Sequence, residues 1–142
     1  MLKDKGQVPN SQKDFLTGII LAAGKSSRMG QLKQVLPSQT KTILQIVVNT
    51  TTKSSLDEVV LVLGYDHIRL MEKVQPLPKH AKIVVNKNYA NGISTSINSG
   101  ISAASLKSTG IAIIHADQPE ITTSFINDLA TKFMGESLPA LR

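Results

Sequence analysis

The chain has 142 residues, of which 41% are hydrophobic and 18% are charged, a balance that fits one globular domain and excludes a disordered or fibrous chain. Cysteine is absent, so disulfides, thiol nucleophiles and thiolate metal sites are excluded, and we expect any bound metal to be a hard cation with oxygen ligands. No apolar run approaches the roughly 20 residues of a membrane span, and the first residues lack the apolar core of a signal peptide. We therefore expect a cytoplasmic protein with no membrane partner.

The net charge of +6 is concentrated in one stretch of the chain. Residues 15–56 contain five basic side chains and no acidic one, whereas residues 57–142 contain eight of each. Nucleic-acid-binding proteins combine basic surfaces with aromatic side chains that stack on bases, but only 4% of the residues are aromatic here. We therefore expect a small polyanion as the ligand and no nucleic-acid partner.

Short apolar runs alternate four times with segments of helical spacing, after a polar stretch at 1–14 that we expect to be a flexible N-terminal tail. This alternation predicts an α/β domain in which helices cover both faces of a mainly parallel sheet. Ligands bind such sheets outside the carboxyl ends of the strands, so the loops that follow the strands are the places to look for a site. The predicted strands are 16–22, 59–63, 83–85 and 110–114, and the predicted helices contain 43–50, 68–72, 93–104 and 125–133.

The loop that follows the first strand has the composition of a phosphate-binding loop. Its glycines, Gly24 and Gly30, allow the backbone to turn and to approach a ligand closely, and its amides and hydroxyls can donate hydrogen bonds to oxygens. Three cations supply the countercharge, namely Lys25, Arg28 and Lys33. The alternative is an ordinary basic surface loop between a strand and a helix.

Two well-known phosphate-binding motifs are excluded at this loop. A Walker A motif needs glycine at position 19, which is Ile19, and the nearby Gly18 lies inside the predicted strand. The dinucleotide fingerprint needs a third glycine and an acid about 20 residues further on, but the next acid is Asp57.

Asp117 follows the fourth predicted strand, in a turn that Pro119 closes. A carboxylate at this end of a strand is well placed to hold Mg²⁺ between phosphates, so Asp117 is our candidate metal ligand. The alternative is a turn or helix-capping aspartate. We interpret Glu120 as a solvated turn residue, and we expect His115 to pack or form hydrogen bonds rather than act as a base.

The segment from Asn86 to Ser96 leads from the third strand into a helix. Asn91 and Gly92 favour an unusual backbone turn there. We expect Ser94 or Ser96 to cap the helix, whose N-terminal amides would face a base edge or a phosphate.

At three places the chain resembles the nucleotidyltransferase family that includes molybdenum-cofactor cytidylyltransferases and guanylyltransferases. The signature loop of that family is matched by Leu21–Gly24, Ser26, Arg28–Gly30 and Lys33. Its metal-binding turn is similar to Asp117 and Pro119, with Ala116 where glycine is common. A segment typical of the cytidylyl branch, and of proteins that mature xanthine-dehydrogenase-type enzymes, resembles Asn86, Tyr89, Gly92 and Ser96.

The resemblance implies a three-layer, Rossmann-like nucleotidyltransferase fold of the nucleotide-diphospho-sugar transferase type. It implies that the protein transfers CMP from CTP to the phosphate of molybdopterin and releases pyrophosphate, with Mg²⁺ as the cofactor and Asp117 as its ligand. Arg28, Lys33 and Asp117 are the implied catalytic residues. The implied nucleotide-binding residues are Leu21, Ala22, Ala23, Gly24, Lys25, Ser26, Ser27, Arg28, Gly30, Lys33, Gly64, Asn86, Gly92 and Ser96.

Ala23 marks the branch of the family, because the cytidylyl branch carries Ala-Ala-Gly where the guanylyl branch usually carries Ala-Gly-Gly. It therefore favours CTP, and a methyl group at this position would crowd a purine while leaving room for a pyrimidine.

The resemblance runs from Leu16 to about Phe133, whereas members of the family usually continue well beyond this point. We therefore expect 15–142 to be a nucleotidyltransferase domain whose C-terminal part is incomplete. A molybdenum hydroxylase is the implied client. The alternatives are a GTP-dependent guanylyltransferase, a sugar-phosphate nucleotidyltransferase, and a maturation chaperone that binds the nucleotide or the cofactor without catalysis.

Overall fold

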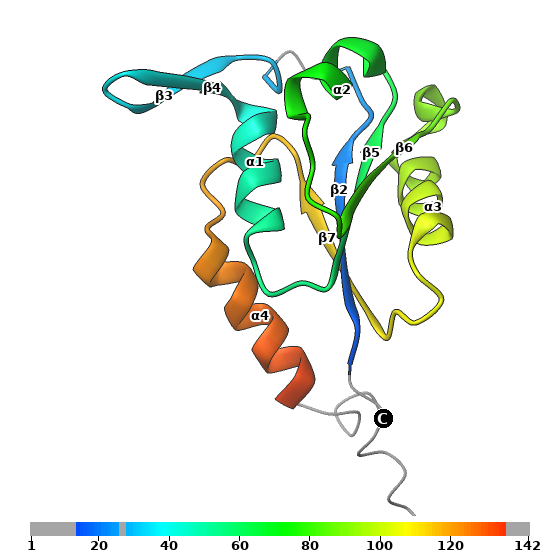
Figure 1. Cartoon of the computed structure of the whole chain (residues 1–142). Helices are drawn as coiled ribbons and strands as arrows, with labels where there is room; N and C mark the ends of the chain where they lie inside the picture. Colours follow the sequence, from blue (N-terminus) through cyan, green and yellow to red (C-terminus); the bar gives the residue numbers. More distant parts are fainter. Residues whose placement is uncertain (1–13, 26–27, 136–142) are drawn as a thin grey trace, which may run out of the picture.

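The computed structural model describes residues 14–25 and 28–135. Four parallel strands form its central sheet in the order β6-β5-β2-β7, as Figure 1 shows. The chain enters at the centre of the sheet, moves outward to one side through β5 and β6, and then crosses to the opposite side to form β7. The strands are β2 (Leu16–Ala22), β5 (Glu58–Leu63), β6 (Ala81–Val85) and β7 (Gly110–His115).

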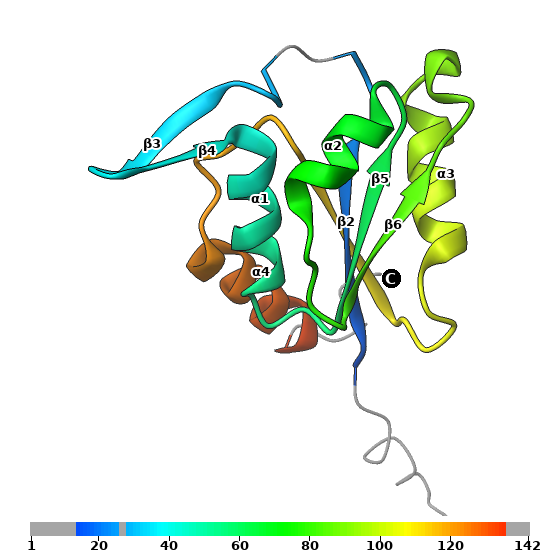
Figure 2. The ribbon, with the colours of Figure 1, turned by 45° about the horizontal axis from the view of Figure 1, so that its top comes forward.

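Helices cover both faces of this sheet, which confirms the predicted layered α/β fold (Figure 2). One face carries α1 (Ile43–Thr52), α2 (His67–Val74) and α4 (Thr123–Gly135), and the other carries α3 (Ile93–Ala103). The buried side chains of β2 alternate between two apolar cores: Ile20 packs towards α1, and Ile19 towards α3. Burial on both faces explains why this strand is a nearly continuous apolar run in the sequence.

The helix α3 contacts the sheet through two small buried residues as well as through Ile97, which packs against the core. Ser96 and Gly100 are buried, whereas Ile93 and Ile101 are about half exposed. A Cβ atom on Gly100 would lie only 2.5 Å from Cγ2 of Ile19, so glycine is what permits this close approach. The sequence therefore located the helix, and Ile97 lies on its contact face, whereas Ile93 and Ile101 lie at the margins.

A hairpin of two strands, β3 (Leu32–Leu36) and β4 (Gln39–Thr42), follows the signature loop and was not predicted. It extends away from the sheet and ends at the start of α1 (Figure 1). All of β3 is exposed, so no alternation of apolar and polar residues marks it in the sequence. Thr42 closes the hairpin and caps α1 in a capping box with Gln45.

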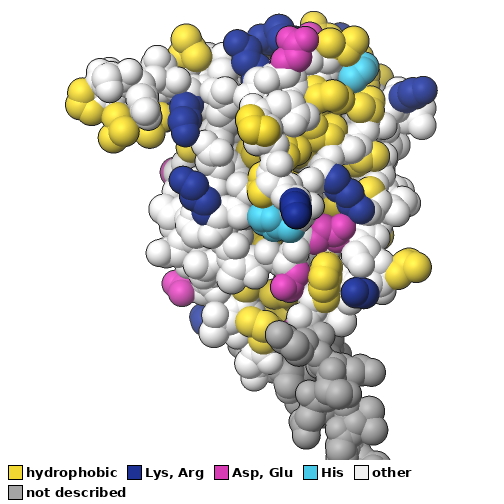
Figure 3. Space-filling view, in the orientation of Figure 1, with side chains coloured by type: hydrophobic (Ala, Val, Ile, Leu, Met, Phe, Trp, Pro, Cys, Tyr) yellow, Lys and Arg dark blue, Asp and Glu magenta, His cyan; other side chains and the backbone are white. Residues whose placement is uncertain are grey.

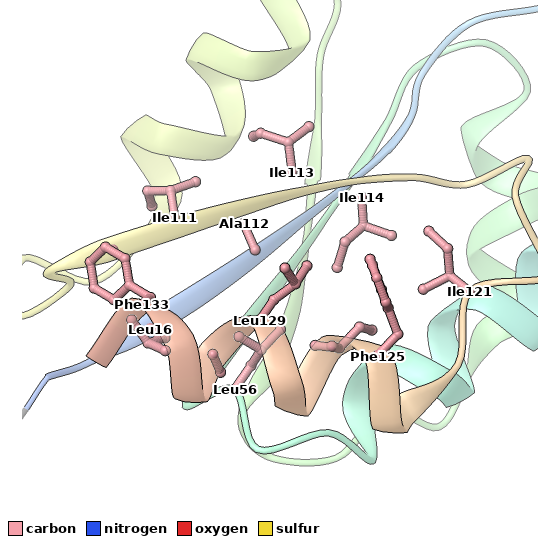
Figure 4. A pocket seen from close by; sticks show the side chains of 13 residues that line it. Leu16, Leu56, Ile111, Ala112, Ile113, Ile114, Ile121, Phe125, Leu129 and Phe133 are labelled. Carbon is pink, nitrogen blue, oxygen red and sulfur yellow. The ribbon is translucent and has the colours of Figure 1, made fainter. Parts of the chain in front are cut away.

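The strand β7 lies at one edge of the sheet, and an apolar pocket of about 270 Å³ lies between it and α4 (Figure 4). Phe125, Leu129 and Phe133 of α4 are each about half exposed at this edge, as are Ile111 and Ile113 of β7 to a slightly lesser degree. Among the described helices, none is both long enough and apolar enough to cross a lipid bilayer.

Glu58 is buried at the amino end of the sheet, opposite the predicted site, and is surrounded by partners. Its Oε1 accepts hydrogen bonds from the Thr17 hydroxyl at 2.9 Å and from the Ser105 N–H at 2.8 Å. Its Oε2 lies 3.1 Å from Nζ of Lys82. Burial alone would raise the pKa of Glu58, but these hydrogen bonds and the charge of Lys82 outweigh burial and hold the pKa below its usual value.

Candidate functional site

A pocket of about 280 Å³ opens at the carboxyl ends of β2 and β7. These two strands are neighbours in the sheet, and the direction in which the chain builds the sheet reverses between them. Such a switch point leaves a crevice where α/β proteins bind ligands. The pocket is lined by Leu21, Ala22, Ala23, Gly24, Met29, Tyr89, Ala90, Gly92, Ile93, Ser96, His115 and Asp117.

The signature loop is fixed to the domain at two points. On its first side, the carbonyl of Ala23 accepts a hydrogen bond from the N–H of Tyr65 at 2.9 Å. On its second side, the carbonyl of Met29 accepts from the N–H of Leu44 at 3.0 Å, and the Met29 side chain is buried in the core. Between these points, a Cβ atom on Gly24 would have nothing within 4 Å. Glycine therefore leaves open space at the pocket, where a ligand can approach the backbone.

The structure brings seven of the predicted site residues together in the pocket: Leu21, Ala22, Ala23, Gly24, Gly92, Ser96 and Asp117. Lys25 and Gly30 line an adjacent pocket on the other side of the loop. Arg28 is exposed within the loop. Lys33 lies in β3, in the exposed hairpin, and lines neither pocket. Ser26 and Ser27 lie outside the described residues, as does the predicted tail apart from Asp14.

Asp117 lies in the turn that follows β7, closed by a hydrogen bond from the N–H of Gln118 to the carbonyl of His115 at 3.3 Å. The helix α4 begins only at Thr123, so Asp117 does not cap it. Within the described ranges, its half-buried carboxylate has no hydrogen-bond or ion-pair partner. An unpartnered carboxylate that lines a pocket is a fitting ligand for Mg²⁺, which is typically held by one or two protein carboxylates together with substrate phosphates and water.

The described residues contain no group of three or more His, Asp or Glu side chains that could hold a metal ion. A metal ion at Asp117 would therefore need oxygens of substrate and water to complete its coordination. His115 also lines the pocket and is exposed.

Asn86 is 3% exposed and fixes the start of α3 from behind the pocket. Its Nδ2 donates to the hydroxyls of Thr95 and Ser96, each at 2.9 Å, and its Oδ1 accepts from the N–H of Asn88. The prediction that Ser94 or Ser96 caps α3 is wrong. The cap residue is Gly92, whose φ of 114° is a conformation that favours glycine, and both serines lie inside the helix.

Gly64 lies at the end of β5 and packs against the signature loop. A Cβ atom at this position would lie 2.8 Å from the carbonyl oxygen of Ala23 and 2.8 Å from Cβ of Tyr89. The methyl group of Ala23, itself almost fully buried, packs beside both residues. In this structure Gly64 therefore supports the pocket through close backbone packing.

Tyr65, in the loop after β5, and Arg69, in the first turn of α2, were not predicted as site residues. Both follow the carboxyl end of a strand, which is where α/β sheets bind ligands. The ring of Tyr65 contacts that of Tyr89 edge to face, with centroids 6.2 Å apart. Nζ of Lys25 lies 5.5 Å from the centroid of Tyr65. These aromatic contacts connect the signature loop to the segment before α3.

Comparison with known proteins identifies related sequences and the family to which they belong. Residues 18–140 match the family described as MobA-like NTP transferase domain. The purine catabolism protein PucB of Bacillus subtilis is 35% identical over 81% of this chain and 59% of its own length. The molybdenum cofactor cytidylyltransferase of Escherichia coli is 36% identical over 73% of this chain and 52% of its own length. The chain thus spans between half and three-fifths of the length of these relatives.

Solved structures share the fold. The crystal structure of the Mycobacterium tuberculosis Rv0371c homologue from Mycobacterium sp. strain JC1 superposes with a TM-score of 0.67 at 31% identity. The superposition covers 84% of this chain and 60% of that one.

Proposed function

Because the chain belongs to the MobA-like NTP transferase domain family, we propose that its pocket binds CTP and transfers CMP to the phosphate of molybdopterin, with release of pyrophosphate. The observation that carries this proposal is that the signature loop and Asp117 line one pocket, at the switch point of the sheet. The name of the Escherichia coli relative, a molybdenum cofactor cytidylyltransferase, supports the choice of reaction.

The reaction is a displacement at phosphorus. An oxygen of the acceptor phosphate forms a bond to the α-phosphorus of CTP, and the bond from that phosphorus to the oxygen that bridges to the β-phosphate breaks. Pyrophosphate leaves with the electron pair. Since the attacking oxygen is already anionic, no general base is required, and catalysis consists of positioning and charge neutralisation.

The residues of this chain divide these tasks. The open backbone at Gly24 admits the phosphates, and the cation of Arg28 balances their charge. Asp117 would hold Mg²⁺, which neutralises negative charge on the phosphates when it is bound. Lys33, proposed from the resemblance, lies in the exposed hairpin and would act on the phosphates from there.

Ala23 supports the choice of CTP. Its methyl group is buried beside Gly64 and Tyr89, and it lines the pocket. We propose that this methyl narrows the pocket for a purine directly and also through the Tyr89 side chain against which it packs. Replacement of Ala23 by glycine, the usual residue in the guanylyl branch, would enlarge the pocket on this side.

The acceptor, the client enzyme and the location are parts of the same proposal. The acceptor is a phosphorylated pterin, the client is a molybdenum hydroxylase of the xanthine-dehydrogenase type, and the reaction takes place in the cytoplasm.

Pyrophosphate release tests the proposal. The protein is isolated from its natural source, its intact mass is measured, and turnover is assayed in Mg²⁺ with CTP, GTP, molybdopterin and a panel of sugar phosphates. We expect release with CTP and molybdopterin, and little with GTP. The variant Ala23→Gly is expected to raise the rate with GTP relative to CTP.

Each other outcome would select a different function. Faster release with GTP would indicate a guanylyltransferase, and transfer to a sugar phosphate would indicate a sugar-phosphate nucleotidyltransferase. Binding of CTP without any release of pyrophosphate would indicate a maturation chaperone.

A further inference from the structure

A second pocket, of about 270 Å³, lies on the other side of the signature loop, between the loop and α2. Gly24 and Met29 line both this pocket and the one that contains Asp117. The two pockets are therefore adjacent, separated by the loop backbone, and an extended ligand that lies across Gly24 enters both. Figure 3 shows basic side chains, with an acidic one beside them, at the top of the molecule above α2.

The net charges of the residues that line the two pockets are opposite in sign. Asp117 is the charged residue among those that line the first pocket. The second is lined by two cations, Lys25 and Arg69, and one anion, Asp66. A chain of phosphates is therefore repelled by the first pocket in the absence of a bound cation and attracted by the second. This separation predicts that different parts of a triphosphate occupy the two pockets.

Arg69 is held in position by Asp66, whose Oδ2 accepts a hydrogen bond from its Nε at 2.6 Å. Asp66 is the cap residue of α2 but makes no capping hydrogen bond, because its side chain is engaged with Arg69 instead. The two terminal nitrogens of Arg69 lie towards the signature loop, 3.5 and 3.7 Å from where a Cβ atom on Gly30 would be. Within the described part of the chain these nitrogens make no hydrogen bond, so they can donate two bonds to a phosphate.

Lys25 contributes the second cation of this pocket. Its ammonium lies over the ring of Tyr65, which belongs to the loop between β5 and α2. This cation–π contact favours a position of Lys25 on the same side of the signature loop as Arg69.

We propose that this second pocket binds the β- and γ-phosphates of the nucleotide, and the pyrophosphate formed from them, through Arg69 and Lys25. The proposal rests on the proposed function and adds to it a residue of α2, outside the signature loop. It also separates the tasks: the pocket of Asp117 contains the reacting α-phosphate, and the pocket of Arg69 contains the leaving group.

Isothermal titration calorimetry in Mg²⁺ with CTP, CMP and pyrophosphate tests this assignment. CMP has a single phosphate and does not extend into the second pocket. For Arg69→Gln we therefore expect the dissociation constants for CTP and pyrophosphate to rise roughly tenfold to a hundredfold, the range for loss of one charge-assisted hydrogen bond, and that for CMP to stay constant. Lys73→Gln is the matched control, because Lys73 is an exposed cation on the same helix that lines neither pocket, and it should change none of the three.

Arg69→Lys refines the test. Lysine keeps the charge but lacks the planar fork that lets arginine bind Asp66 and a phosphate together, so an intermediate loss is expected. Equal affinities of wild type and Arg69→Gln for CTP and pyrophosphate would overturn the assignment, and so would a parallel loss of CMP binding. If the wild-type protein binds pyrophosphate through Arg69 but binds no nucleotide, the second pocket is confirmed as a phosphate-binding site and the proposed function is wrong. If it binds neither, both fail.

Discussion

The carboxylates at the two ends of the sheet differ in their hydrogen-bond partners. At the amino end, Glu58 has a partner for each oxygen and connects β5 to β2, to β6 and to the loop before β7. At the carboxyl end, Asp117 has no partner within the described ranges and lines a pocket. A buried charge is tolerated when its oxygens are satisfied, whereas an unpartnered one is free to bind a ligand. From this comparison we assign a structural role to Glu58, whose oxygens all have partners, and propose a binding role for Asp117, whose carboxylate has none in the described residues.

The largest expected effect comes from removal of the charge at the carboxyl end. In Asp117→Asn, turnover measured by pyrophosphate release should fall roughly hundredfold or more, since the proposed ligand of the Mg²⁺ that would stabilise charge in the transition state is lost. The midpoint of thermal unfolding should change little, because Asp117 has no intramolecular partner in the described structure. Asp128→Asn, an exposed position on α4, is the control. Retained turnover in Asp117→Asn would remove Asp117 as the essential ligand.

Arg28→Ala tests the cations of the signature loop at the same end. Loss of one charge-assisted hydrogen bond to a phosphate is expected to cost about 1.5–3 kcal/mol, which corresponds to a dissociation constant for CTP raised roughly tenfold to a hundredfold. Titration calorimetry measures it, with Lys53→Ala, an exposed cation at the far end of α1, as the matched control. Unchanged binding of CTP would show that the guanidinium does not contact the nucleotide.

Glu58→Ala is the converse experiment at the amino end. It leaves the hydroxyl of Thr17 and the N–H of Ser105 without their acceptor, so the free energy of unfolding should fall by about 2–3 kcal/mol. Urea denaturation measures this loss. The affinity for CTP, measured where the variant is still folded, should stay that of the wild type because the network lies at the opposite end of the sheet. A loss of binding with no loss of stability would contradict the division of roles between the two ends.

The smallest expected effect is the pH dependence of stability. The pKa of Glu58 is lower in the folded protein than the usual value of 4.5. Its ionised form therefore stabilises the fold fully above pH 4.5, and this contribution is lost as the pH falls through the folded pKa. The difference in unfolding free energy between wild type and Glu58→Gln should accordingly be largest near neutral pH and shrink below pH 4. If this difference in unfolding free energy instead grew as the pH falls, the pKa of Glu58 would be higher in the folded protein than its usual value.

The sequence was sufficient to locate the alternating strands and helices and the loops that form the pocket. Those predictions depend on local patterns, such as the apolar run at 16–22 and the residue types of the signature loop. The position of Asp117 followed from the general rule that ligands bind at the carboxyl ends of parallel strands.

Other features depend on tertiary contacts, and no local pattern in the sequence predicts these features. The hairpin at 32–42 is exposed and held by backbone pairing, so it leaves no apolar period. The cap of α3 is Gly92, and the hydroxyl of Ser96 inside the helix accepts a hydrogen bond from Asn86, which follows β6. Arg69 reaches the signature loop only because α2 packs beside it, which no spacing along the chain reveals.

Gly100 has a mechanical consequence for the pocket. The helix α3 packs against Ile19 at Gly100, near its C-terminal end, while Gly92 and Ser96 towards its N-terminal end line the pocket. We expect any side chain at position 100 to push α3 away from β2 and so to displace the side of the pocket that Gly92 and Ser96 form. We expect the width of the pocket to depend on how closely α3 approaches β2 at Gly100, which does not line the pocket. Paired changes of volume at Gly100 and Ile19 are therefore expected to alter the shape of the pocket without changing any residue that lines it.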